Sequence, residues 1–138
     1  MRKPMDIKIP ALKTLDSQAY DMKSLKGKVC VVSYFQTWCG DCVMEQPELQ
    51  KLQNRFGDSL TVLMVSDEPI PKIKAFKERF QSNLNFYHSD AKLKTDLGVS
   101  AYPTTILIDK KGKEKLKRVE GIEWYNAETI QAVSDCLK

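Results

Sequence analysis

Hydrophobic and polar positions along the chain alternate in two patterns that predict a succession of strands and helices. Short apolar runs rich in β-branched and aromatic residues cover residues 29–36 and 60–65, as is typical of buried strands. Apolar residues spaced three or four positions apart lie on one side of a helix. This spacing runs from Cys42 to about Phe56 and recurs over residues 69–80, at Ile73, Phe76 and Phe80.

The remaining segments complete an α/β architecture. We expect an extended segment around residues 7–15, a short strand at 84–87, a short helix at 91–97, two strands flanking Gly112 and a last helix from about residue 127. Strands that alternate with helices and end in a hairpin predict a mixed, partly parallel β-sheet flanked by helices. The chain has 138 residues, is 42% hydrophobic and contains no linker-like stretch, so we expect one domain over residues 1–138.

Two cysteines, Cys39 and Cys42, lie where the apolar run over residues 29–36 gives way to the helical pattern. A CxxC pair at such a turn is typical of a redox site, because the two thiols can close into a disulfide and reopen. At the helix N-terminus, unpaired backbone N–H groups would stabilise the Cys39 thiolate. Cys42 follows one turn later and is placed to attack a mixed disulfide formed on Cys39. We therefore expect Cys39 to be the nucleophile and Cys42 the resolving cysteine.

The same helix predicts a buried carboxylate beside the pair. Its inward face contains Cys42, Glu45, Leu49, Leu52 and Phe56. A carboxylate on an apolar face is costly without a partner or a task. Our hypothesis is that Glu45 accepts and returns the proton of Cys42, with its own pKa raised by desolvation. The spacing is equally compatible with an edge position from which Glu45 reaches water. Pro47 leaves one helical hydrogen bond unmade, and we expect a kink there.

Motifs spread along most of the chain resemble those of one protein family. They are Trp38-Cys39-Gly40-Asp41-Cys42, Glu45-x-Pro47, Tyr102-Pro103-Thr104-Thr105, the lead Leu25-Lys26-Gly27-Lys28, Ser66-Asp67-Glu68 and a hairpin over residues 106–113. In combination they resemble the TlpA/ResA branch of thioredoxin-like proteins, which includes the cytochrome c maturation reductases. The resemblance implies a thioredoxin-like fold with an N-terminal extended segment and a central insertion.

The resemblance also implies a role for each matching residue. Cys39 and Cys42 match the family's nucleophilic and resolving cysteines, and Glu45 matches the buried glutamate that assists their proton transfer. Pro103 matches a cis-proline that lies against the disulfide. The backbone of Tyr102 would pair with the bound polypeptide, and Trp38 and Thr104 complete the expected substrate-binding residues. The implied activity is thiol–disulfide exchange with protein substrates, in the direction of a reductase, with the cysteine pair as the only redox centre and no metal.

The dipeptide between the cysteines departs from the family. Many relatives have proline or glutamate there, whereas this chain has Gly40-Asp41. Without proline the first helical turn is less rigid, and the Asp41 carboxylate repels a nearby thiolate. We expect these residues to tune the reduction potential, with Asp41 making the protein more reducing than a proline version. Thioredoxins proper have a buried aspartate where this chain has Ser33, which leaves Glu45 as the evident internal proton carrier.

Three other functions on related folds fit the sequence less well. A peroxiredoxin-like peroxidase would have its reactive cysteine in a threonine-containing loop motif that this sequence does not show. A copper chaperone of the related fold would need CxxxC and a downstream histidine ligand, and the single histidine, His88, is more simply explained as a core or surface residue. A binding module without redox activity would have no need of Cys39, Cys42, Glu45 and Pro103 together.

The charge pattern indicates the expected partners. The net charge is +4, and a basic cluster overlaps the predicted hairpin: Lys110, Lys111, Lys113, Lys115, Lys117 and Arg118. Lysines of this kind keep an edge strand soluble, and without interleaved aromatics or a known motif they do not indicate nucleic-acid binding. We expect a monomer whose partners are protein thiols or disulfides and an upstream electron-donor protein.

The sequence and the family resemblance point to different compartments. The sequence shows no run of about 18 apolar residues that would span a membrane, and no signal peptide is visible at residues 1–6. The chain is therefore either cytoplasmic or a trimmed form of an exported protein. The resemblance favours a periplasmic or otherwise extracytoplasmic location.

Two further cysteines lie outside the CxxC pair. Cys30 falls in the first predicted strand and Cys136 in the last predicted helix. Both are expected to be small buried apolar residues. A structural Cys30–Cys136 bridge is possible, because the last helix packs on the sheet in this fold. It is the less favoured alternative, since free cysteine is commonly buried without a partner.

Overall fold

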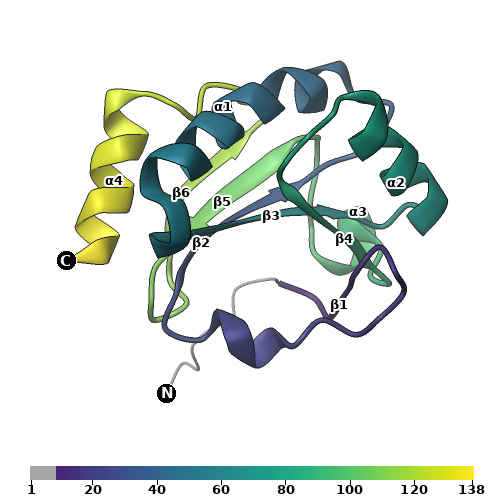
Figure 1. Cartoon of the computed structure of the whole chain (residues 1–138), viewed down its shortest axis with the longest axis horizontal. Helices are drawn as coiled ribbons and strands as arrows, with labels where there is room; N and C mark the ends of the chain where they lie inside the picture. Colours follow the sequence, from purple (N-terminus) through teal and green to yellow (C-terminus); the bar gives the residue numbers. More distant parts are fainter. Residues whose placement is uncertain (1–8) are drawn as a thin grey trace.

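Six strands form one mixed sheet in a computed structural model of the chain, which describes residues 9–138 (Figure 1). In spatial order they are β1 (Leu12–Lys13), β4 (Asn85–Ser89), β3 (Leu60–Ser66), β2 (Val29–Tyr34), β5 (Thr104–Ile108) and β6 (Glu114–Val119). The central strands β2, β3 and β4 run parallel to one another, while β1, β5 and β6 are antiparallel to their neighbours. The predicted mixed sheet with a closing hairpin is confirmed.

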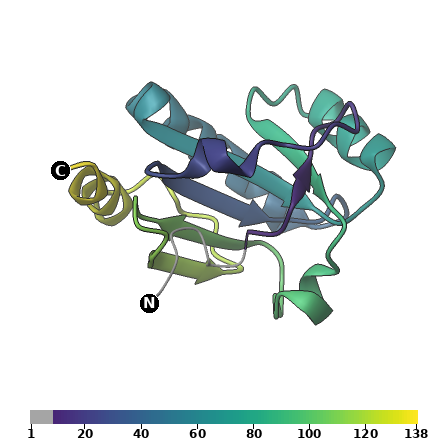
Figure 2. The same ribbon diagram turned by 90° about the horizontal axis from the view of Figure 1, so that it is seen from below.

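Helices and the N-terminal segment cover the two faces of this sheet (Figures 1 and 2). One face packs against α1 (Gly40–Phe56), α2 (Ile70–Arg79) and α4 (Ala127–Leu137). The other face packs against the 3-10 helix η1 (Met22–Leu25) and the short helix α3 (Leu93–Asp96). A second 3-10 turn, η2 (Gly57–Ser59), joins α1 to β3. Because side chains alternate along a strand, β2 sends Val29 and Val31 to the α1 face and Val32 to the opposite one.

The long helix α1 is fixed at both ends and along one side. Cys39 forms its N-terminal cap, and Gly57 ends it at a positive φ of 54°, a conformation that glycine adopts without a steric penalty. Leu49 and Leu52 are fully buried beneath it, and each such side chain contributes roughly 2 kcal/mol. Pro47 lies inside α1 as expected, and the kink at this position stays a prediction.

Some predicted elements are shorter in the structure. Of the extended segment expected around residues 7–15, only Leu12–Lys13 is a strand, and residues 7 and 8 lie outside the described residues. The helix expected over 91–97 spans only Leu93–Asp96. The Ser89 hydroxyl accepts the Ala91 N–H at 3.1 Å, and this side-chain bond holds the backbone in a turn where the helix was expected to begin.

The alternative of a Cys30–Cys136 bridge is wrong. Cys30 is fully buried in the cluster on the η1 face of the sheet, whereas Cys136 is half-buried against the cluster beneath α1 and α4. The sheet separates the two thiols, and both cysteines are free. Cys30 is the buried apolar residue that was expected, and Cys136 is only partly so.

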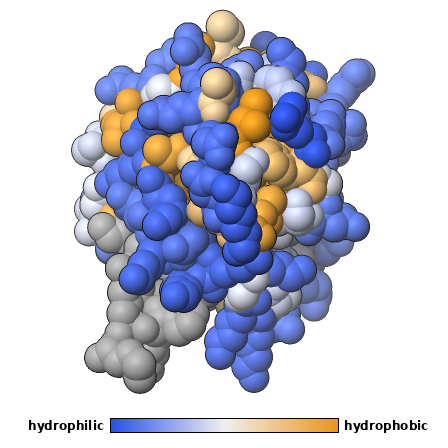
Figure 3. Space-filling model, turned by 90° about the vertical axis from the view of Figure 1, so that its left-hand side faces the viewer, coloured by the Kyte–Doolittle hydropathy of each residue, from blue (hydrophilic) through white to orange (hydrophobic). Residues whose placement is uncertain are grey.

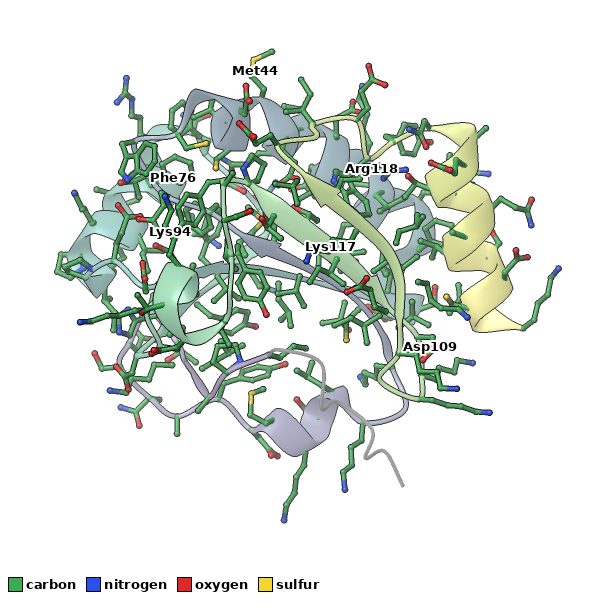
Figure 4. The ribbon with its side chains drawn as sticks, turned by 180° about the vertical axis from the view of Figure 1, so that it is seen from behind. Met44, Phe76, Lys94, Asp109, Lys117 and Arg118 are labelled. Atoms are coloured by element: carbon green, nitrogen blue, oxygen red, sulfur yellow. The ribbon has the colours of Figure 1, made fainter. Side chains whose placement is uncertain are left out.

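The basic cluster divides into exposed lysines and one structural arginine. Lys110, Lys111, Lys113, Lys115 and Lys117 are exposed, and the side of the molecule that carries α4 is mostly hydrophilic (Figure 3). Arg118 instead reaches from β6 towards α4 (Figure 4). Its guanidinium donates to the Thr129 hydroxyl at 2.9 Å and to the Glu128 carboxylate at 2.6 Å, and it lies 4.5 Å from the Trp124 ring centroid. Arg118 therefore fastens the last helix to the edge of the sheet.

Candidate active site

The two cysteines of the CxxC motif occupy unequal positions at the start of α1. Cys39 lies just before the helix with 7% of its surface exposed, while Cys42 is completely buried one turn later. The Cys39 sulfur accepts the backbone N–H of Cys42 at 3.2 Å. A sulfur that accepts a helical N–H group is stabilised as a thiolate. The more exposed of the two sulfurs is therefore also the one that accepts a hydrogen bond from the helix terminus.

The loop before β5 closes over the reactive thiol from the other side. The Tyr102–Pro103 peptide bond is cis, as expected from the family resemblance. The Cys39 thiol lies 3.4 Å from the Tyr102 carbonyl oxygen. The Tyr102 ring meets the exposed Trp38 ring edge to face at 5.8 Å, and the Lys94 ammonium group, which comes from α3 (Figure 4), lies 5.5 Å from the Tyr102 ring centroid. Aromatic surface thus borders the position where a substrate would meet Cys39.

Thr104 has an internal task in this loop. It is almost fully buried, and its hydroxyl donates to the Ala101 carbonyl at 2.7 Å. This bond shapes the turn that presents Tyr102 and Pro103. A direct contact between Thr104 and a substrate stays a prediction.

Glu45 is fully buried and does not reach water at an edge, which decides between the two positions that the helical spacing left open. Its carboxylate oxygens each accept a hydroxyl proton at 2.6 Å, one from Ser33 on β2 and one from Thr105 on β5. Burial raises the pKa of Glu45 to about 7, against the opposing effect of these two hydrogen bonds. The carboxyl group can therefore gain or lose a proton near neutral pH.

Cys42 holds its proton firmly in the reduced protein. Burial raises the pKa of its thiol far above the ordinary value, and the side chain of Cys39 acts in the same direction. The charge of Glu45 adds a smaller effect of the same sign. A buried thiol of this kind becomes a nucleophile only when a nearby group removes its proton.

Gly40 and Asp41, the residues between the cysteines, are both exposed in the first turn of α1. A Cβ atom added at Gly40 would meet no other atom within 4 Å. The structure therefore imposes no steric demand for glycine at this position. The proposed effect of the dipeptide on the reduction potential stays a prediction.

A family model described as Redoxin matches residues 5–131 of the chain. The chain belongs to the Redoxin family. Its relatives include the thioredoxin-like protein YneN of Bacillus subtilis, which is 29% identical over 106 residues, covering 74% of this chain and 62% of YneN. The thiol:disulfide interchange protein DsbE of Pseudomonas aeruginosa is 37% identical over 89 residues, covering 64% of this chain and 49% of DsbE.

A third relative, the thiol-disulfide oxidoreductase ResA of Geobacillus thermodenitrificans, is 31% identical over 110 residues, covering 75% of this chain and 62% of ResA. The chain thus spans between 49% and 62% of the length of these three relatives. The expected resemblance to ResA-like, thioredoxin-like proteins is confirmed.

Solved structures agree with this assignment at the level of the fold. A candidate thiol:disulfide interchange protein DsbE from Chlorobium tepidum superimposes with a TM-score of 0.82 at 19% identity, covering 100% of this chain and 99% of that chain. A secreted disulfide oxidoreductase of Mycobacterium tuberculosis, homologous to DsbE of E. coli, gives a TM-score of 0.71 at 18% identity, covering 91% and 94%. The predicted thioredoxin-like fold is confirmed.

Sequence reasoning missed the hydroxyl partners of Glu45. In the sequence, Ser33 stands out only as the position where thioredoxins proper have an aspartate, and Thr105 only as part of a motif. The two residues lie opposite each other in the antiparallel pairing of β2 with β5, and both are fully buried. A single small polar residue within an apolar strand run was the available signal.

A second pair of missed residues supports the segment before Cys39. The buried Glu68 carboxylate accepts the backbone N–H and the hydroxyl of Thr37, each at 2.8 Å. Asp67 accepts the Gln36 amide at 2.9 Å and the Leu93 N–H at 2.9 Å. Both acids directly follow the parallel strand β3, beside the end of β2. Polar side chains at adjoining strand ends are the signal that could have identified them.

His88 has a structural environment. One ring nitrogen lies 2.7 Å from the Glu68 carbonyl oxygen and the other 3.2 Å from an Asp90 carboxylate oxygen. Among residues 9–138, no three His, Cys, Asp or Glu side chains are grouped so that they could hold a metal ion. No helix in that range is long and apolar enough to cross a membrane.

Proposed function

We propose that this chain is a thiol–disulfide oxidoreductase that exchanges disulfides with protein substrates through Cys39 and Cys42, working as a reductase. The asymmetry of the pair supports this proposal most directly. Cys39 retains a small exposed surface, caps the helix by accepting the Cys42 N–H and lies beside the cis-proline loop, whereas Cys42 is fully buried one turn before Glu45 on α1. An inert binding domain would need none of these features.

The first half-reaction takes place at Cys39. Its thiolate attacks one sulfur of a substrate disulfide, so that a Cys39–substrate disulfide forms and the original substrate disulfide breaks. The departing substrate sulfur leaves with the electron pair and takes a proton from solvent. Trp38, Tyr102, Pro103 and Thr104 are the residues that we expect to border the bound polypeptide.

The second half-reaction takes place at Cys42. Its thiol gives a proton to the Glu45 carboxylate, and the resulting thiolate attacks the Cys39 sulfur. The Cys39–Cys42 disulfide forms while the second substrate sulfur departs as a thiolate. The substrate has then gained two electrons, and the protein has lost two. An upstream electron-donor protein would restore the dithiol, so the cysteine pair is the only redox centre that the cycle requires.

An extracytoplasmic location suits this activity. One structural neighbour is described as a secreted disulfide oxidoreductase, and disulfide-bonded substrates are concentrated outside the reducing cytoplasm. A cytoplasmic location is the alternative. The partners in either case are proteins with exchangeable thiols or disulfides.

Insulin reduction with dithiothreitol as the electron source tests the proposed activity. The wild-type chain should accelerate reduction, and Cys39→Ser should remove the acceleration. Cys136→Ser is the matched control and should retain the wild-type rate, because Cys136 lies on α4 outside the site. Full activity in Cys39→Ser would refute the mechanism. Cys42→Ser should accumulate a mixed disulfide with the substrate, detectable by mass spectrometry.

A further inference from the structure

We propose that Ser33 and Thr105 are positioning residues that allow the buried Glu45 carboxyl group to gain and lose a proton while all its hydrogen bonds remain satisfied. The inference deepens the proposed function and rests on it, because Glu45 there receives the proton of Cys42. It assigns a specific task to two hydroxyl groups that the CxxC motif does not include.

The three side chains form a closed contact triangle. The Ser33 hydroxyl lies 2.6 Å from one Glu45 oxygen, the Thr105 hydroxyl lies 2.6 Å from the other, and the two hydroxyl oxygens are 3.2 Å apart. All three residues are fully buried. Glu45 comes from α1, and the antiparallel pairing of Ser33 with Thr105 on β2 and β5 brings the two hydroxyls beneath it.

In the ionised state both hydroxyls must donate to the carboxylate. Each hydroxyl has one proton and can accept further hydrogen bonds. When Ser33 and Thr105 each donate to a different carboxylate oxygen, no proton lies between the two hydroxyls. Both Glu45 carboxylate oxygens then accept a hydrogen bond, as a buried carboxylate requires.

In the protonated state one hydroxyl can turn to complete a ring. The carboxyl O–H donates to the Thr105 oxygen, Thr105 donates to the Ser33 oxygen across 3.2 Å, and Ser33 continues to donate to the other Glu45 oxygen. Every proton in this ring has an acceptor. The change between the two states is a rotation of the Thr105 hydroxyl, so neither state leaves a buried polar atom without a partner.

The groups around the ring make Cys42 the natural exchange partner. On β2 and β5 the carboxyl group meets two uncharged hydroxyls, and on α1 it interacts electrostatically with Cys42. Cys39 and Tyr102 interact with Cys42 in turn. Burial raises the pKa of Glu45 to about 7, which suits a group that must accept and return one proton.

Carbon-13 NMR of the glutamate side-chain carboxyl groups tests the ring without any substrate. The Glu45 signal is identified by its loss in Glu45→Gln. Thr105→Val keeps the shape of the side chain but removes one donor to the carboxylate, so the Glu45 titration midpoint should rise by about one pH unit, a tenfold change in proton affinity. Thr105→Ser restores a hydroxyl and should titrate as the wild type does. A midpoint in Thr105→Val that is unchanged or lower overturns the proposal.

Two further measurements guard against a variant that fails to fold. Ser33→Ala removes the other donor and should shift the midpoint in the same direction. Infrared spectra of the wild-type protein below the midpoint should show a Glu45 carbonyl stretch lowered by hydrogen bonding, relative to that of a free carboxylic acid. A stretch at the free position overturns the ring, because Ser33 would then not be donating.

A kinetic measurement separates failure of the ring from failure of the proposed function. In proteins that retain Cys42, the mixed disulfide on Cys39 can be followed by rapid mixing with a disulfide substrate. The pH at which it resolves at half its maximal rate should rise by about one unit in Thr105→Val, a tenfold change, and stay unchanged in Thr105→Ser. A purely structural role would lower stability in Thr105→Val and leave this pH unaltered, which refutes the proposal. If the wild-type chain reduces no disulfide, the proposed function fails instead, and the NMR titration still decides the ring.

Discussion

Replacing Glu45 with glutamine should make the reduced protein more stable at alkaline pH. The folded protein holds the Glu45 proton up to a pKa of about 7, whereas an ordinary glutamate releases it near 4.5. Between these values the folded state binds more protons than the unfolded state, so the free energy of unfolding falls as the pH rises. The stability associated with Glu45 is therefore fully present below pH 4.5 and lost by about pH 8.

The size of this loss follows from the difference between the two pKa values. Each pKa unit corresponds to about 1.4 kcal/mol, so the change from 4.5 to about 7 corresponds to about 3 kcal/mol. Glu45 is fully buried, so solvent does not screen this effect. Glutamine has the same shape, accepts from one hydroxyl and donates to the other, and carries no charge at any pH. Near pH 4 the two proteins should therefore have similar stability.

Urea unfolding of the reduced protein at several pH values between 4 and 8 measures the effect. The difference in unfolding free energy between Glu45→Gln and the wild type should grow with pH to about 3 kcal/mol. Contributions from groups that are unchanged by the substitution occur in both proteins and cancel. The matched control is Glu78→Gln, an exposed position on α2, where the same loss of a carboxylate should change the free energy of unfolding little. A Glu45→Gln difference that stays flat or shrinks as the pH rises would contradict the reasoning.

Three further predictions concern the motif dipeptide, the outlying cysteines and the last helix. Asp41→Pro should have a less negative reduction potential than the wild-type protein, as measured by equilibration with glutathione. Asp41→Asn, which removes only the charge, should shift the potential in the same direction. A potential equal to or lower than that of the wild type would refute the tuning hypothesis. Alkylation of the oxidised protein after unfolding in denaturant without reductant, followed by mass spectrometry, should label Cys30 and Cys136, and a disulfide between them would contradict the fold. Arg118→Met should lower the free energy of unfolding by about 2 kcal/mol, whereas the exposed Lys117→Met should change it little; equal effects would show that Arg118 does not fasten α4.

The elements that the sequence predicted well are those whose own residues determine them. The apolar runs of β2 and β3 and the helical spacing of α1 and α2 are local patterns, and the structure places these elements within two residues of the expected bounds. Elements that depend on distant contacts were predicted less well. β1 is a two-residue pairing with β4, and α3 begins later than expected, after a turn in which the Ala91 N–H donates to the Ser89 hydroxyl.

The same distinction applies to the site. The spacing within one helix placed Glu45 on the inward face of α1, but it left open whether the carboxylate is buried or reaches water, and the structure decides for burial. Its two hydroxyl partners are 12 and 60 residues away in the chain, and only the pairing register of β2 with β5 brings them together. The sequence shows that these strands contain polar residues, but it does not show which of them face each other across the sheet. The support of Thr37 by Glu68 was missed for the same reason, since it joins residues 31 positions apart.

Two departures from thioredoxins, Ser33 in place of a strand aspartate and a buried Glu45 on α1, form one arrangement. Where thioredoxins proper have a buried aspartate on the strand, this chain has a hydroxyl, and the carboxyl group comes instead from α1 one turn beyond Cys42. Ser33 still contacts that carboxyl group at 2.6 Å, so the acid is displaced from the strand to the helix but stays above the same point of the sheet. A strand hydroxyl that must serve two protonation states needs a second hydroxyl to exchange with, and Thr105 supplies it at 3.2 Å. Changing Ser33 to aspartate would therefore place two buried carboxyl groups side by side, and like-charge repulsion should leave one of them protonated well above neutral pH.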